Sequence, residues 1–300
     1  MAKTKKKSAG SGAGWPLVLS YISSLLLTVL AALLLLYSTL CSASYMQGQV
    51  RKTGFGQTAY QAMCEDFTSY AAATGFSAET LTGVISQDQI ETDLNADIDR
   101  LYDDVYARDT HLEIAEAAYS AMEAEAQAKG VTLEGQVKEG VEVIAEAMRQ
   151  EYVGYTNTPL ASQLHTFILK VEKIMWVGVA ICAVFTALAL ILMMRMSKNN
   201  ARLGARCLVF SFGAAAVVCL VLGLAIYPLL NLQNLNLNPL AFKNLVLGYV
   251  QGMFSRFNIF AVLYFIIALL LGELLGFHKR RQKDKLYVMD ADNNPINPAE

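Results

Sequence analysis

One carboxylate, that of Glu273, stands close to a long apolar segment, where an ionisable side chain is a functional candidate by default. Glu273 precedes Lys279 by six residues. On a helix this is about 9 Å, so the carboxylate can reach the membrane surface and pair with a basic side chain there. An interfacial ion pair is the simpler interpretation, and we keep Glu273 as a candidate functional acid beside it.

A second acidic pattern imitates a calcium-binding loop, with oxygen-bearing side chains at alternate positions. Its members are Asp93, Asn95, Asp97, Asp99 and, at position twelve, Asp104. An EF-hand needs glycine at position six and a bidentate glutamate at position twelve. Ile98 stands at position six and continues an apolar helical stripe. The segment therefore predicts the acidic face of a helix.

Other chemistry-bearing residues lack a motif. The histidines, His111, His165 and His278, fall on different segments, and no pair of cysteines or histidines has the spacing of a zinc site. Gly54-Phe-Gly56 lacks the third glycine and the downstream acid of a nucleotide-binding loop. We therefore expect no catalytic residues, no cofactor and no metal, and we rank enzymes last among the function classes.

Four apolar segments define the class of protein. They cover residues 16–40, 174–194, 207–230 and 257–271 of a chain that is 54% hydrophobic. A helix of about 20 apolar residues crosses the hydrocarbon core of a bilayer. We predict an all-α fold, an integral membrane four-helix bundle with an extracytoplasmic helical domain between spans one and two.

The charges set the orientation of these spans. Basic clusters occur in three places, at Lys3–Lys7, Arg195–Arg206 and Lys279–Lys285. Basic flanks stay cytoplasmic, so four spans with both termini inside are the topology that satisfies all three. Segment 42–172 carries 8 basic and 21 acidic residues, a formal charge of −13, and faces outward. We expect a multi-pass plasma-membrane protein that contacts lipid and, because its basic runs are short, binds no nucleic acid.

This topology divides the chain into nine parts. The expected order is a basic cytoplasmic tail (1–14), the first span (15–41), an acidic helical extracytoplasmic domain (42–172), the second span (173–195), a basic cytoplasmic loop (196–206), the third span (207–230), an outer loop with an amphipathic helix (231–256), the fourth span (257–277) and a cytoplasmic tail (278–300). A cleaved signal peptide is the rival for the first span. Its apolar run of roughly 24 residues exceeds the about 7–15 of a signal-peptide core, which favours an uncleaved anchor. A Cys41–Cys64 bridge stays open.

Small residues at four-residue steps could pack the spans together, because lipid gives helices no hydrophobic reason to associate. The packing candidates are Ser20, Ser24, Thr28 and Ala32 in span one, Gly178, Cys182 and Thr186 in span two, Ser211, Ala215, Cys219 and Gly223 in span three, and Gly272 and Gly276 in span four. The same seams would suit a homodimer, which stays open.

The extracytoplasmic domain reads as consecutive helices. A helix over 57–73 ends at Gly75, and Ser77, Ser86 and Asp109 are expected N-caps. Three apolar stripes follow: Ile90, Leu94, Ile98, Leu101 and Val105; then Leu112, Ala115, Tyr119, Met122 and Ala126; then Leu133, Val137, Val141, Ile144 and Met148. A helix that begins at Thr158-Pro159 is expected to run into span two. The helix that begins at Asn238-Pro239 lies either in the membrane interface or against this domain.

Three stretches of the chain resemble uncharacterised four-pass membrane proteins of Gram-positive, clostridia-like bacteria. They are GFSAETLTGVISQDQIETDLNADIDRLYDD, the turn SKNNARLGARCLVFSFGAAAVV and the helix before span four. The resemblance covers most of residues 15–280 and implies no known activity. The order of one span, a large outer domain and three more spans is also similar to FtsX- and MacB-like permeases of ABC systems, although the turn after span two lacks their acidic coupling segment.

These features favour a non-enzymatic membrane protein whose outer helical domain senses, binds or scaffolds at the cell surface. We expect it to act through a protein partner in the membrane or envelope. A permease-like subunit of an ABC system is the alternative. A small transporter or channel ranks lower, because no span has a charge in its middle.

The topology predicts that a reporter fused after Glu300 is cytoplasmic. Green fluorescent protein should fluoresce there, and alkaline phosphatase should be inactive, while the same phosphatase inserted at residue 130 should be active. Protein sequencing should find no mature chain that begins near Ser44. A phosphatase that is active after Glu300 would contradict the assignment.

Overall fold

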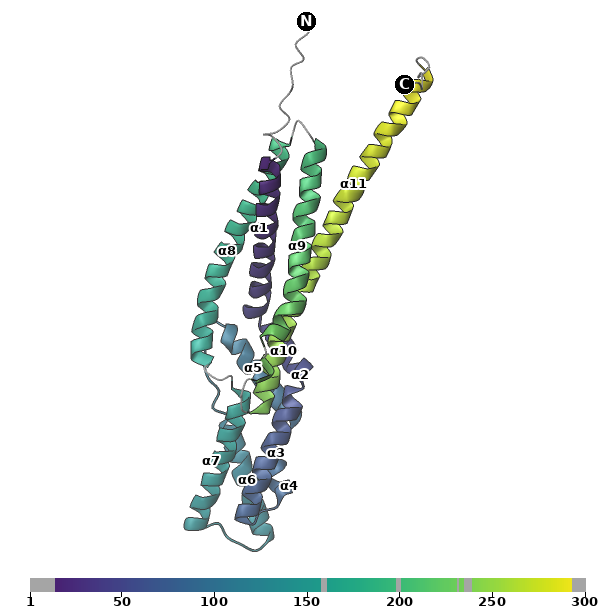
Figure 1. Cartoon of the computed structure of the whole chain (residues 1–300). Coiled ribbons are helices and arrows are strands. Elements are labelled where there is room, and N and C mark those ends of the chain that lie inside the picture. Colours follow the sequence, from purple (N-terminus) through teal and green to yellow (C-terminus); the bar gives the residue numbers. More distant parts are fainter. Residues whose placement is uncertain (1–13, 158–160, 198–200, 231, 235–238, 293–300) are drawn as a thin grey trace. The chain divides into compact units, whose positions relative to one another are not determined.

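A computed structural model describes residues 14–157, 161–197, 201–230, 232–234 and 239–292 of the chain, with side chains described up to residue 275. The elements, in order, are α1 (Gly14–Leu40), α2 (Ala43–Thr53), α3 (Phe55–Thr74), α4 (Ala78–Thr82), α5 (Gln87–Tyr102), α6 (Leu112–Ala128), α7 (Gln136–Thr156), α8 (Ala161–Met196), α9 (Ala201–Leu229), the 3-10 turn η1 (Leu232–Asn234), α10 (Leu240–Ser255) and α11 (Phe257–Asp292) (Figure 1). The described residues contain helices and no strand, so the all-α prediction is confirmed.

The helices group into two units. The apolar unit comprises Met1–Leu35, Met175–Leu230 and Phe254–Glu300, and the acidic unit comprises Leu36–Ile174 and Asn231–Met253. The first segment of the acidic unit contains the residues 42–172 that carry the formal charge of −13. Segment 231–253 joins the same unit, although it lies far away in sequence.

Local sequence explains most helix ends in the acidic unit. The hydroxyls of Ser77 and Ser86 accept hydrogen bonds from the backbone N–H groups of Thr80 and Gln89, as predicted for N-caps. Gly75 ends α3 with a φ of 80°, a left-handed conformation that glycine adopts without steric cost.

The core of the acidic unit is built from one face of each long helix. Its buried members include Phe55, Met63 and Phe67 of α3, Ile90, Leu94 and Ile98 of α5, Ile114 and Met122 of α6, and Val141, Met148 and Tyr152 of α7. Ala241 and Leu245 of α10 belong to the same core. Of the two readings of the Asn238-Pro239 helix, packing against the domain formed by segment 42–172 is therefore the one observed, and the helix begins at Leu240.

Three predicted stripe positions and one cap are wrong. Helix α5 ends at Tyr102, which leaves Val105 79% exposed. Leu112 and Val137 are also exposed, because α6 turns Ile114 and Ala118 inward and α7 turns Val141 inward. Asp109 does not cap α6. His111 occupies the N-cap position instead.

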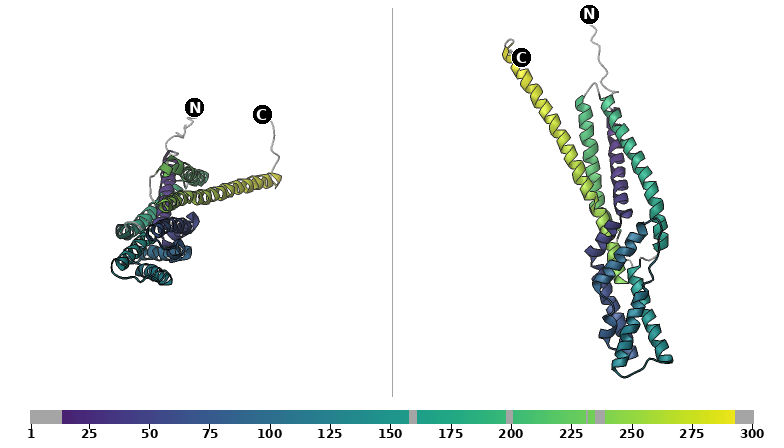
Figure 2. Two further views of the ribbon diagram at one scale, coloured as in Figure 1. Left: turned by 90° about the horizontal axis from the view of Figure 1, so that it is seen from below. Right: turned by 180° about the vertical axis from the view of Figure 1, so that it is seen from behind.

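The apolar unit contains the helices predicted to be spans. Among the described residues, four helical segments are long and apolar enough to cross a membrane. Helix α8 runs unbroken over 36 residues, as expected for the segment that leads into span two, whereas its predicted start at Thr158-Pro159 lies outside the described residues. Helix α11 also has 36 residues and ends at Asp292; it is drawn in green to yellow in Figure 2. The segment 278–292 therefore continues the helix of the predicted fourth span.

The core predicts which side-chain substitution destabilises the acidic unit. Phe67 is fully buried, so Phe67→Ala should cost about 3–5 kcal/mol and lower the unfolding temperature by roughly 10 °C. Val105→Ala is the control, because Val105 is mostly exposed, and it should change the temperature by less than about 2 °C. The measurement is thermal unfolding of the detergent-solubilised protein, followed by circular dichroism. Equal changes in unfolding temperature for the two variants would contradict this core.

Candidate functional site

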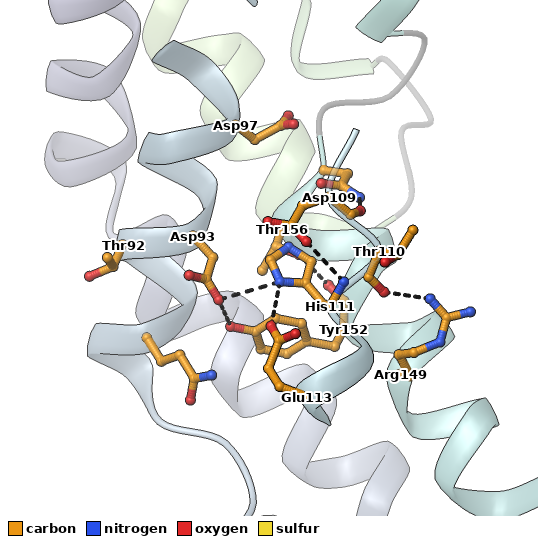
Figure 3. A network of polar contacts seen from close by, with 12 residues as sticks. Thr92, Asp93, Asp97, Asp109, Thr110, His111, Glu113, Arg149, Tyr152 and Thr156 are labelled. Atoms are coloured by element: carbon orange, nitrogen blue, oxygen red, sulfur yellow. Dashed lines mark hydrogen bonds and ion pairs between the residues drawn. The ribbon is translucent and has the colours of Figure 1, made fainter. Parts of the chain in front are cut away.

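A polar cluster joins α5 to the start of α6 in the acidic unit (Figure 3). Asp93 lies on α5, and the calcium-like alternation around it is helical, as predicted. His111 and Glu113 come from the start of α6. The three ligand atoms that these side chains offer lie within 4.8 Å of one another.

His111 is held in an unusual backbone conformation. Its φ of 46° and ψ of 48° are left-handed, and it is the one non-glycine residue with positive φ in the described part of the chain. Such a conformation costs an ordinary residue about 1–2 kcal/mol. The backbone N–H of His111 donates to Oδ1 of Asp109 at 3.1 Å, and Oδ2 of Asp109 accepts from Arg100 at 3.1 Å. Arg100 and Asp109 thus fix the turn that positions the imidazole.

The imidazole of His111 faces two carboxylates. Its Nδ1 lies 3.0 Å from Oε1 of Glu113 and 3.7 Å from Oδ2 of Asp93. The hydroxyl of Tyr152, on α7, donates to the same Asp93 oxygen at 2.5 Å, and its ring meets that of His111 edge-on at 5.3 Å. His111 is 2% exposed, Asp93 24% and Glu113 60%, so the cluster opens to solvent on the Glu113 side.

The surroundings shift the proton affinities of two neighbours. Burial, and then the hydrogen bond to Asp93, raise the pKa of Tyr152, so that its hydroxyl stays a donor. The backbone N–H of His111, together with the charge of Arg100, holds the pKa of Asp109 below its usual value. Asp109 is therefore a carboxylate at neutral pH.

Sequence reasoning missed this cluster. Eighteen residues separate Asp93 from His111, and the segment between them has no helical period that would align them. The signals that were present are weak: an aspartate two residues before a histidine, and a glutamate two residues after it.

A cavity of about 530 Å³ is the second candidate site, and it too lies within the acidic unit. Its lining is almost wholly apolar. The residues are Leu40, Met46, Leu94, Tyr102, Gly154, Leu164, Phe167, Ile168, Val171, Pro239, Phe242, Leu245, Val246 and Tyr249. The hydroxyl of Tyr102 donates to the carbonyl oxygen of Leu40 at 3.2 Å, and that of Tyr249 to the carbonyl oxygen of Thr39 at 3.0 Å. Both phenols therefore already have acceptors.

Several predicted packing residues lie at helix contacts in the apolar unit. The hydroxyls of Ser20 and Ser211 are 3.0 Å apart and join α1 to α9. The thiol of Cys182, on α8, lies 3.6 Å from the carbonyl oxygen of Leu26 on α1. A Cβ on Gly223 of α9 would lie 2.4 Å from Oδ1 of Asn258 on α11, so glycine permits that close approach.

The other packing candidates differ in burial. Ser24, Thr186, Ala215 and Cys219 are buried, while Thr28, Ala32 and Gly178 are partly buried. Gly272 is exposed, with nothing within 4 Å of a Cβ placed on it, and the side-chain surroundings of position 276 lie outside the described set. Glu273 is exposed as well, and its expected partners after residue 278 also lie outside that set.

Comparisons with protein-family models, with curated proteins and with solved structures give no match to this chain.

The turn that holds His111 predicts a pH-dependent stability. The pKa of Asp109 is lowered on folding, so its charge stabilises the fold above the ordinary aspartate pKa, and this contribution is lost as the pH falls through the lowered value. Asp109→Asn should lower the unfolding temperature by a few degrees at pH 7 and by less at pH 3. Asp104→Asn, at an exposed position, is the control. A difference between wild type and Asp109→Asn that is the same at both pH values would contradict this role.

Proposed function

We propose that the chain is a non-enzymatic, multi-pass plasma-membrane protein whose acidic unit lies outside the cell and binds a lipid acyl chain in the apolar cavity. A protein partner would respond to whether the cavity is occupied. The observation that carries this proposal is the cavity. Its volume and apolar lining are those of a small-molecule site.

The absence of free polar groups in the lining favours an acyl chain over a polar ligand. Of the lining side chains, only Tyr102 and Tyr249 carry a hydroxyl, and both hydroxyls donate to backbone carbonyls. A sugar or a peptide would leave its own polar groups unpaired there, at a cost of about 1–3 kcal/mol each. A hydrocarbon chain has none to satisfy.

Helix α8 contributes an apolar side to the cavity. Phe167 and Val171 line the cavity, and Ile174, Ile181 and Phe185 continue the same face of the helix at three-, four- and seven-residue steps. Phe167 is 52% exposed and Ile174 is 69% exposed. The side of α8 that lines the cavity is thus apolar at Phe167, Val171 and Ile174 and has Lys170 at its edge.

The boundary of that span offers sites for a lipid headgroup. Lys170 and Lys173 lie one turn apart on α8, and neither is buried. Trp176 follows them, and tryptophan is enriched at membrane–water interfaces. Cations at this level suit an anionic phosphate, which makes an anionic phospholipid the ligand that best fits both ends of the site.

Two helices that line the cavity also lead into spans. Helix α8 continues to Met196 without interruption, and α10 is followed by α11 after one residue. A ligand in the cavity would contact the cavity-lining ends of both α8 and α10. The proposed cytoplasmic link between α8 and α9 is short, residues 197–200, so we assign the output to a partner protein.

The alternative is the permease-like subunit of an ABC system. Its support is the order of one span, a large outer segment and three further spans, which the four apolar helices fit. Co-purification of an ATPase from membranes would favour it. Cross-linking of detergent-solubilised protein would test the homodimer.

A cavity-filling variant tests lipid binding without damage to the fold. Gly154 lines the cavity from α7, and nothing lies within 4 Å of a Cβ built there. Gly154→Leu should fill part of the cavity and also stabilise the helix by about 1 kcal/mol. Binding of phosphatidylglycerol, measured by native mass spectrometry of protein in detergent, should weaken at least tenfold while the unfolding temperature rises.

Gly140→Leu is the matched control, because Gly140 lies on the same helix, is exposed and does not line the cavity. It should gain stability and keep the lipid. If Gly154→Leu binds phosphatidylglycerol as wild type does, the cavity is not the lipid site. Lys170→Gln with Lys173→Gln should reduce binding of phosphatidylglycerol more than that of phosphatidylcholine.

A further inference from the structure

We infer that Asp93, His111 and Glu113 bind a zinc-like divalent transition-metal ion on the acidic unit. The three side chains supply one imidazole nitrogen and two carboxylate oxygens, which are ligand types of protein zinc sites. With a neutral imidazole the ligand set carries a formal charge of −2, which one divalent ion neutralises.

The distances suit a shared ion. Two zinc–ligand bonds of about 2.1 Å at a tetrahedral angle hold their donor atoms about 3.4 Å apart. Nδ1 of His111 lies 3.0 Å from Oε1 of Glu113 and 3.7 Å from Oδ2 of Asp93, which brackets this spacing. The third pair, one carboxylate oxygen each from Asp93 and Glu113, lies within 4.8 Å. Rotation of the exposed Glu113 side chain would close this pair by up to about 1.4 Å to reach tetrahedral spacing, with a fourth position left for water.

The surroundings position two of the three ligands. Tyr152 donates to the Asp93 carboxylate, and Asp109, held by Arg100, fixes the backbone of His111. Hydrogen bonds of this kind orient metal ligands in known sites. Glu113 is the exposed member, so an ion would reach the cluster from solvent on that side (Figure 3).

The ligand set also selects among ions. Calcium and magnesium prefer oxygen ligands alone, whereas imidazole suits zinc, copper, nickel and iron. Coordination through Nδ1 places the ring proton on Nε2, which is buried and has no hydrogen-bond partner among the described residues. Loss of such an outer partner typically weakens metal binding 10–100-fold, so we expect micromolar rather than nanomolar affinity.

The ion would tie α5 to the start of α6. Asp93 is the neighbour of Leu94, which lines the apolar cavity. A bound ion would therefore stiffen the helix that forms one wall of that cavity. The metal site rests on its own geometry and does not depend on the cavity binding lipid.

Zinc titration of the full-length protein in detergent, after treatment with a chelator, tests this inference. Competition with a chromophoric zinc chelator should reveal one micromolar site per chain that millimolar calcium leaves unchanged. His111→Asn removes the imidazole, and asparagine tolerates the left-handed backbone better than most residues. Both His111→Asn and Glu113→Gln should weaken binding at least tenfold. Glu116→Gln, one turn further along α6 and exposed, should leave it unchanged.

Cobalt substitution separates this site from other metal-binding groups. Co²⁺ here should show d–d bands without the near-ultraviolet charge transfer of a cysteine ligand, and His111→Asn should abolish them. Zinc should raise the unfolding temperature of wild type but not of Glu113→Gln. Tight zinc binding that survives both substitutions, or the absence of any micromolar site in a folded wild type, would overturn the inference.

Discussion

Hydrocarbon offers no hydrogen-bond partners to a peptide backbone, so a chain that enters it must satisfy every N–H and C=O group from within. Four long apolar helices meet this demand here, and the basic residues collect outside them. In the proposed topology, the acidic segment 42–172 lies on one side of the membrane. Its helices then need a core of their own, since most of its 21 acidic side chains are not buried.

Polar contacts between the proposed spans are few and short. In the apolar unit, the Ser20 and Ser211 hydroxyls meet between α1 and α9, and the Tyr264 hydroxyl donates to the carbonyl oxygen of Leu27 at 2.9 Å. Where no hydrophobic force drives helices together, such bonds and close backbone approaches such as that at Gly223 specify which faces meet. The small-residue seams therefore matter chiefly for register.

The sequence predicted features that depend on local chemistry. Ser77 and Ser86 cap helices because their hydroxyls reach the N–H groups three residues on, and Ile90, Leu94 and Ile98 are buried because their spacing places them on one helix face. Val105 was misplaced because a helical period does not say where the helix ends. The Asp93–His111–Glu113 cluster and the cavity depend on contacts between distant segments. A single sequence has no signal for a void between helices or for a left-handed histidine.

The last turn of α1 carries a further consequence. Carbonyl groups at the end of a helix have no partner within it, and those of Thr39 and Leu40 accept hydrogen bonds from Tyr249 of α10 and Tyr102 of α5. Two phenols thus hydrogen-bond the end of α1 to segments more than 60 and 200 residues away in sequence. Because the covalent chain runs on from Leu40 into α2, these two bonds set the direction in which the last turn of α1 meets α5 and α10, and loss of either phenol would leave a helix-end carbonyl without that hydrogen bond.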